Sequence, residues 1–139
     1  MLVSLNVMAA TSVLLKTKTV VGFAPEDYRG VFTTSVLSNG VVQYENNKGV
    51  VTNVLKLSKT AVKAIVAKIA ALEVGELQGE DTPPCMDAPS TSNIVLKNGV
   101  EIEIKTVFGC RELVMNSSGS YELNRTIDSL DTVADLIKH

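Results

Sequence analysis

The chain has little of the chemistry from which most active sites are built. It contains no tryptophan, and aromatic residues make up only 4% of its 139 residues. Its single histidine is His139, the last residue, and a side chain at a frayed terminus makes a poor general base. Ser-His and Cys-His nucleophile pairs therefore lack their base. We expect no catalytic set of these kinds, no bound metal and no cofactor.

Charge of one sign is not in excess either. Lysine and arginine together number 13 and aspartate and glutamate 15, which gives a net charge of −2. A balanced charge offers no general attraction to nucleic acid, and the shortage of aromatic residues removes base stacking. The chain also lacks a run of about 20 apolar residues, so no transmembrane segment is predicted.

The apolar content is sufficient for a folded core. Hydrophobic residues make up 45% of the chain, and 139 residues is a common length for one domain. The pattern of strands and helices predicts a single α+β domain over residues 1–139. Its expected order is a β-meander, a helix, a β-hairpin and a second helix, with the two amphipathic helices packed on antiparallel sheet.

Residues 1–24 are the ambiguous part of the chain. Their apolar start resembles an export segment, but no basic residue precedes Lys16. We interpret them as strands near 2–9 and 13–22, because polar and apolar side chains alternate with a period of two in the second stretch. The pattern leaves open whether residues 1–24 belong to the core or are peripheral. One face of the second strand would carry Leu15, Thr17, Thr19 and Val21.

Three stretches rich in β-branched residues predict the meander, at residues 31–37, 41–45 and 50–57. Asn39-Gly40 separates the first two stretches. An Asn-Gly pair between strands is typical of a type I′ turn, in which both residues take positive φ.

Apolar side chains at spacings of three and four predict two helices. Ser58 is expected to cap the first one through its hydroxyl. The second is expected to run from Asn124 to the end of the chain. The first apolar stripe consists of Val62, Ile65, Val66, Ile69 and Leu72, and the second of Ile127, Leu130, Val133 or Ala134, and Ile137.

A second hairpin is predicted from residues 93–97 and 100–107, joined by Asn98-Gly99, and residues 111–115 allow a short further strand. Strict alternation in the returning strand would leave one of its faces in water. Its core residues would be Val100, Ile102 and Ile104, with Thr106 as a further candidate, and its solvent-facing residues Glu101, Glu103 and Lys105.

The only two cysteines, Cys85 and Cys110, stand on either side of this hairpin in polar, turn-like surroundings. We predict that they form a disulfide, which in the chain-entropy model would stabilise the fold by roughly 3–4 kcal/mol. A disulfide favours an oxidising compartment such as the periplasm or the extracellular space. Two reduced, buried thiols in an intracellular protein are the alternative.

The segment Pro84-Cys-Met-Asp-Ala-Pro-Ser-Thr91, followed after the hairpin by Phe108-Gly-Cys110, resembles a group of small exported bacterial proteins of uncharacterised function. These share a paired-cysteine hairpin after an amphipathic helix, and the match in layout covers residues 29–115. The resemblance implies a periplasmic or secreted location and a disulfide, and it implies no activity. The order of elements is also similar to that of some proteinaceous protease inhibitors.

These observations together predict a non-catalytic, exported binding module, with inhibition of an enzyme such as a protease as one form of it. The expected partner is a protein, and exposed sheet edges could accept a partner strand or a second copy of the chain. One alternative is a small hydrolase or lyase that uses carboxylates of the 73–87 connection. Another is a carrier of a small ligand, with a pocket between helix and sheet. The predicted contact residues are Pro83, Pro84, Met86, Asp87 and Pro89.

Overall fold

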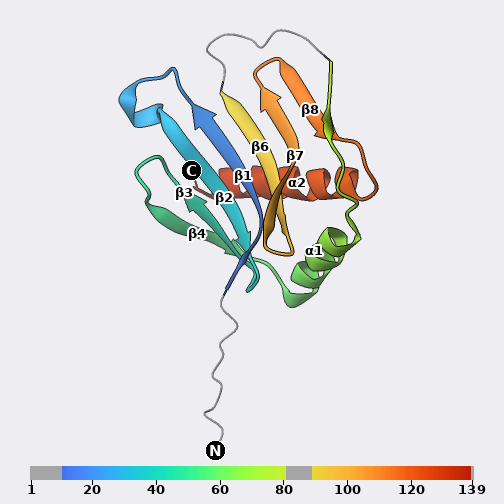
Figure 1. Cartoon of the computed structure of the whole chain (residues 1–139). Coiled ribbons are helices and arrows are strands. Elements are labelled where there is room, and N and C mark those ends of the chain that lie inside the picture. The colour runs from blue at the N-terminus through green and yellow to red at the C-terminus, as the bar shows by residue number, and fades with distance from the viewer. Residues whose placement is uncertain (1–10, 81–88, 139) are drawn as a thin grey trace, which may run out of the picture.

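The computed structural model describes residues 11–80 and 89–138 (Figure 1). These residues form an eight-stranded antiparallel sheet and two α-helices, so the predicted α+β class is confirmed. No helix among them is long and apolar enough to cross a membrane. The elements are β1 Val13–Val21, the 3₁₀ turn η1 Glu26–Tyr28, β2 Gly30–Leu37, β3 Val41–Glu45, β4 Val51–Lys56, α1 Lys59–Ala71, β5 Leu77–Gln78, β6 Ser90–Lys97, β7 Val100–Phe108, β8 Arg111–Met115 and α2 Ser120–Lys138.

β1 lies in the middle of the sheet, whose strand order is β4-β3-β2-β1-β6-β7-β8-β5. It pairs with β2 on one side and with β6, far along the chain, on the other. The sequence left open whether residues 1–24 belong to the core. The central position of Val13–Val21 shows that this part of the segment does. The predicted strand near residues 2–9 lies outside the described residues.

The predicted order of elements is matched in part. The meander β2–β4, the helix α1, the hairpin β6–β7 and the helix α2 follow one another as expected, while β8 and the two-residue strand β5 extend the sheet beyond the hairpin. α2 begins at Ser120, one turn earlier than the predicted Asn124. Leu123 thereby joins the apolar face of α2 and is fully buried.

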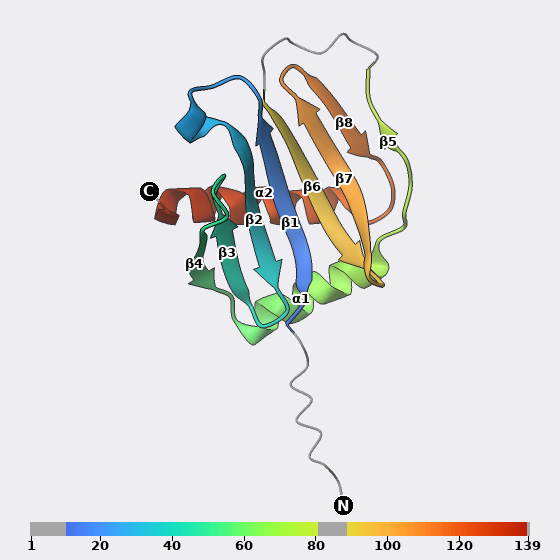
Figure 2. The same cartoon turned by 60° about the vertical axis from the view of Figure 1, so that its left-hand side comes forward.

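α2 crosses one face of the sheet, and α1 lies beside it at the end of the sheet where β4 leads into α1 (Figures 1 and 2). The helices contribute Ile65, Ile69 and Leu72 and, from α2, Leu123 and Ile127 to one hydrophobic core. Two predicted stripe residues, Val66 and Ile137, are exposed, so their assignment to the stripes is wrong. Of the two alternatives that the sequence left open on α2, Ala134 is buried and Val133 is exposed.

The two Asn-Gly turns differ. Asn98 and Gly99 both have positive φ, at 54° and 77°, as a type I′ turn requires. At the first turn only Gly40 does, at 92°, and three residues rather than two join β2 to β3. The type I′ prediction is therefore wrong for the first turn, where the backbone carbonyl of Gly40 also accepts a hydrogen bond from the N–H of Leu57.

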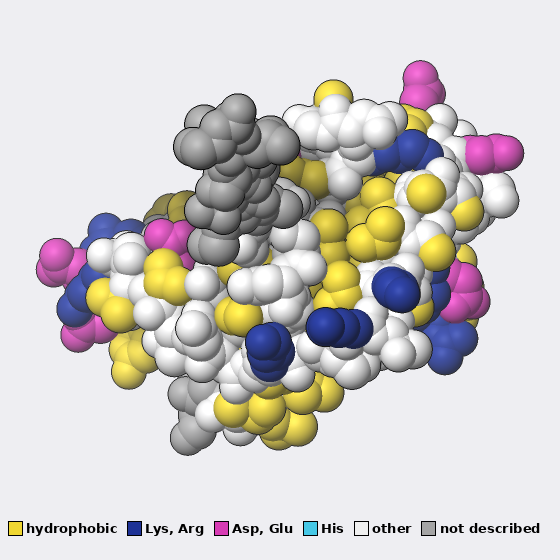
Figure 3. All heavy atoms as spheres, turned by 90° about the horizontal axis from the view of Figure 1, so that it is seen from below, with side chains coloured by type: hydrophobic (Ala, Val, Ile, Leu, Met, Phe, Trp, Pro, Cys, Tyr) yellow, Lys and Arg dark blue, Asp and Glu magenta, His cyan; other side chains and the backbone are white. Residues whose placement is uncertain are grey.

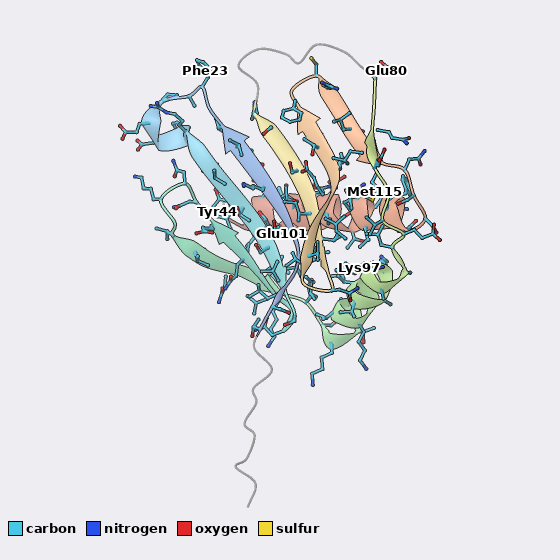
Figure 4. All side chains as sticks on the ribbon, in the orientation of Figure 1. Phe23, Tyr44, Glu80, Lys97, Glu101 and Met115 are labelled. Atoms are coloured by element: carbon cyan, nitrogen blue, oxygen red, sulfur yellow. The ribbon has the colours of Figure 1, made fainter. Side chains whose placement is uncertain are left out.

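Both ends of α1 are capped by side chains. The hydroxyl of Ser58 accepts a hydrogen bond from the N–H of Ala61 at 3.1 Å, which confirms the predicted cap. At the other end Lys97, labelled in Figure 4, donates to the carbonyls of Ala70 and Leu72. A cation at this position satisfies free carbonyls and complements the negative end of the helix dipole.

Candidate functional site

Most of the contact residues predicted from the sequence lie outside the described residues. These are Pro83, Pro84, Met86 and Asp87, and Cys85 lies there too, so the disulfide with Cys110 stays a prediction. Pro89 is exposed at the start of β6, and its carbonyl accepts a hydrogen bond from the N–H of Gly109. The described end of the connection is thus held against the β7–β8 turn.

The carboxylates proposed for the hydrolase alternative are not gathered in the part of the connection that the structure describes. Glu73, Glu76 and Glu80 are all exposed, and Asp81 and Asp87 lie outside the described residues. Across residues 11–80 and 89–138, no group of three or more His, Cys, Asp or Glu side chains could hold a metal ion.

The structure instead forms a polar hollow between α2 and strands β1–β3, which we call the threonine–aspartate pocket. Its volume is about 300 Å³, at the lower end of the range of small-ligand sites. Hydroxyls and carboxylates supply its polar atoms, and two aromatic rings contribute to its wall. The lining residues are Thr17, Thr19, Phe32, Thr34, Tyr44, Asp131 and Asp135.

Strand register brings the sheet residues of this pocket together. Thr17 lies opposite Thr34, which in turn lies opposite Tyr44, so these three side chains form one row across β1, β2 and β3. Residues directly opposite each other in antiparallel strands point to the same face. Thr19 and Phe32 form a second row two residues farther along. On the other side of the threonine row, an apolar row of Leu15, Val36 and Val42 belongs to the core.

Asn93 of β6 holds α2 in place over this part of the sheet. The hydroxyl of Thr17 donates to its side-chain oxygen at 3.2 Å. Its side-chain nitrogen donates to Asn124 at 3.0 Å and to Asp128 at 2.9 Å. Asp128 and Asp131, three residues apart on a helix, lie on neighbouring positions of its surface. The network around Asn93 thereby orients the helix so that Asp131 lines the pocket.

A β-bulge completes the network. Asn93 pairs with Lys105 but Ile94 pairs with Glu103, so Ile104 is an extra residue in β7. Lys105 was predicted to face water, and this prediction is wrong. Its ammonium nitrogen instead lies 3.1 Å from a carboxylate oxygen of Asp128. Val100, the first residue of β7, was predicted to face the core, and this prediction is also wrong because its side chain is exposed.

Thr34 is the unusual residue of the pocket. Its side chain is only 7% exposed, yet its hydroxyl forms no hydrogen bond with any residue in the described part of the chain. The hydroxyl oxygen itself is not among the fully buried side-chain atoms that lack a partner in the described part of the chain, so it faces the open hollow, where water or a ligand can reach it. Asp131 is half-buried and has no ion pair among the described residues. The pocket thus offers polar atoms that the protein itself does not use.

A second hollow of about 390 Å³ runs between α1 and α2. Figure 3 views the molecule from the side on which α1 lies, where hydrophobic and basic side chains gather. Ile65 and Leu130 contribute apolar surface to this groove, and Lys68 donates a hydrogen bond to the hydroxyl of Thr126 across it. Two of its polar side chains are thus already in contact with each other.

Comparison of the chain with family models, with curated proteins and with solved structures finds no match. The function is therefore inferred from the geometry of the molecule.

Sequence reasoning missed the threonine–aspartate pocket, although part of its signal was present. The alternation in residues 13–22 placed Thr17 and Thr19 on one face, and Asp131 and Asp135 are one helical turn apart. Nothing in the sequence indicated which strand would lie beside β1, and the pocket depends on that pairing.

Proposed function

We propose that this protein is a non-catalytic binding module that holds a small polar ligand in the threonine–aspartate pocket. The observation that carries the proposal is a hollow of about 300 Å³ whose lining includes the Thr34 hydroxyl and the Asp131 carboxylate, two polar groups with no protein partner in the described part of the chain. A ligand that fills the hollow could hydrogen-bond to both groups without displacing an existing protein hydrogen bond. Of the functions considered from the sequence, this is the ligand carrier with a pocket between helix and sheet.

Native mass spectrometry of the protein purified from its source under mild conditions tests this proposal. We expect a small molecule to be carried through purification and to be lost from a Thr34→Val variant, which keeps the side-chain shape and removes the hydroxyl. Thr33→Val is the matched control, because Thr33 lies next along β2 on the opposite face of the sheet and does not line the pocket. Equal retention of the molecule by both variants would contradict the proposal.

A protein partner remains a second proposal, for the segment that contains Pro83, Pro84, Met86, Asp87 and Pro89. It is favoured by the exposure of Pro89 and by the hydrogen bond that holds Pro89 to the β7–β8 turn. Inhibition of a protease is one form that this binding could take. A pull-down with the oxidised protein as bait should lose its partner when residues 81–90 are scrambled, and retention of the partner would refute this role.

We also propose that the protein is exported and that Cys85 and Cys110 form a disulfide, as in the small exported bacterial proteins that the motif resembles. The proposal is supported by the position of Cys110 in the two-residue turn between β7 and β8, whose Gly109 donates a hydrogen bond to the carbonyl of Pro89. Intact mass after alkylation of the unfolded, unreduced protein counts free thiols. We expect none, and two labelled cysteines would rule out the disulfide.

A further inference from the structure

The threonine–aspartate pocket carries negative charge, and the carboxylate of Asp131 is a hydrogen-bond acceptor with no partner in the described part of the chain, whereas Asp135 already has one. Among its lining residues are two carboxylates, those of Asp131 and Asp135, and no lysine, arginine or histidine. A carboxylate accepts hydrogen bonds and donates none, whereas a threonine hydroxyl can do both. The nearby ammonium group of Lys105 is paired with Asp128 and does not line this pocket.

We infer that the ligand of this pocket is a small organic cation that carries a primary ammonium group. This inference rests on the proposed function of the pocket as a ligand site. An ammonium group has three N–H donors and a positive charge. Its N–H groups can donate to a carboxylate or to a hydroxyl, which are the groups that Asp131 and Thr34 present to the pocket without a partner in the described part of the chain.

The aromatic side chains of the pocket favour the same class of ligand. Phe32 and Tyr44 both line the hollow. The face of an aromatic ring attracts a cation, and the methylene groups of an alkyl amine can pack against the same ring. A simple metal ion has no methylene groups and would not make the second contact.

The size of the pocket also distinguishes an organic cation from a metal ion. Its volume is about 300 Å³, whereas a water molecule occupies about 30 Å³ in the liquid. A calcium ion needs 6–8 oxygen ligands close around it, and the pocket has only two carboxylates in a hollow far wider than one ion. A chain of several carbon atoms with an ammonium group fills such a space.

Isothermal titration calorimetry on the full chain with 1,5-diaminopentane tests the inference. We expect binding that weakens about 10- to 100-fold in Asp131→Asn and in Thr34→Val, the range for lost hydrogen bonds to a charged group. Glu122→Gln changes the net charge of α2 equally but lies away from the pocket, and Thr33→Val repeats the threonine substitution on the opposite face. Both controls should bind as the natural protein does.

Two further titrations separate this inference from the proposed function. 1,5-Pentanediol has the same chain with neutral ends, and calcium chloride supplies a metal ion. If the diol binds as tightly as the diamine and Thr34→Val abolishes both, the ammonium assignment is overturned and a small-ligand pocket stands. Tighter binding of calcium, lost in Asp131→Asn, overturns it in favour of a metal site. If no probe binds and native mass spectrometry finds no ligand, both the inference and the proposed function fail.

Discussion

On the face of the sheet away from α2, Lys16 and Glu101 form an ion pair across β6. The ammonium nitrogen of Lys16 lies 2.6 Å from a carboxylate oxygen of Glu101. The hydrogen bond from Lys16 and its positive charge lower the pKa of Glu101 below its ordinary value. Because the Glu101 side chain is 57% exposed, solvent screens the pair and its contribution to stability is small.

The pair should give stability a specific pH dependence. A carboxyl group whose pKa is lowered by folding stabilises the protein above its unfolded pKa, about 4.3 for glutamate, and this contribution is lost as the pH falls through the folded pKa. Glu101→Gln should therefore be slightly less stable than the natural protein at pH 7 and equally stable once the pH falls below the folded pKa. Urea unfolding from pH 7 to pH 2 measures the difference.

Lys16→Met provides the control for this prediction. In that background the Glu101→Gln substitution should change stability little at any pH, because the partner is gone. Raising the ionic strength should also reduce the difference at pH 7. A difference between the natural protein and Glu101→Gln that stays the same from pH 7 to pH 2 would contradict this account.

At the scale of elements, the two Asn-Gly turns show that one dipeptide can serve two structural purposes. Both Gly40 and Gly99 have positive φ, a conformation that costs other residues roughly 1–2 kcal/mol. A Cβ on Gly99 would meet no atom within 4 Å, whereas one on Gly40 would lie 2.6 Å from the carbonyl oxygen of Leu57. Gly40 is thus confined by the chain segment between β4 and α1 as well as by its own turn.

Gly40→Ala and Gly99→Ala should therefore differ although the substitution is the same. Gly99→Ala should cost about 1 kcal/mol, from backbone strain alone. Gly40→Ala should cost at least about 1 kcal/mol more, because the backbone of Leu57 has to move and its hydrogen bond to Gly40 is put at risk. Chemical unfolding followed by circular dichroism measures both, and equal losses would show that the Leu57 contact does not confine Gly40.

At the scale of the whole molecule, the pairing of β1 with β6 joins the two halves of the chain into one sheet. Thr17 lies opposite Asn93, and the hydrogen bond between their side chains spans 76 positions in sequence. The core is likewise shared, because Ile65 and Ile69 of α1 cluster with Leu123 and Ile127 of α2. Neither half has a complete core of its own.

A fragment of residues 1–72 should consequently not fold alone. It would keep β1–β4 and α1 but lose β6, which leaves the edge of β1 unpaired and the buried helix residues without α2. Circular dichroism of this fragment should show no cooperative unfolding. A mixture with a fragment of residues 73–139 should again unfold cooperatively. Cooperative unfolding of the 1–72 fragment by itself would show that the halves are independent.

The sequence by itself determined the local structure. Periodicity and turn residues identified the meander, the hairpin and both helices, and the hydroxyl of Ser58 identified the start of α1. These signals are local, because each depends on residues that lie close together in the sequence. The bulge at Ile104 escaped them, since the side chain that bonds its carbonyl is that of Asn124 on α2. The early start of α2 at Ser120 was missed although its signal is local, because the Ser120 hydroxyl bonds to Met115 and Ser117.

Only the tertiary structure decided that β1 is central and that a polar pocket lies beside the core. Strand alternation assigns side chains to two faces, but it does not say which strand becomes the neighbour of which. The row of Thr17, Thr34 and Tyr44 exists because of pairing register, and Asp131 reaches it because Asn93 and Asp128 orient α2. The pocket is therefore a product of long-range pairing, to which no single stretch of sequence corresponds.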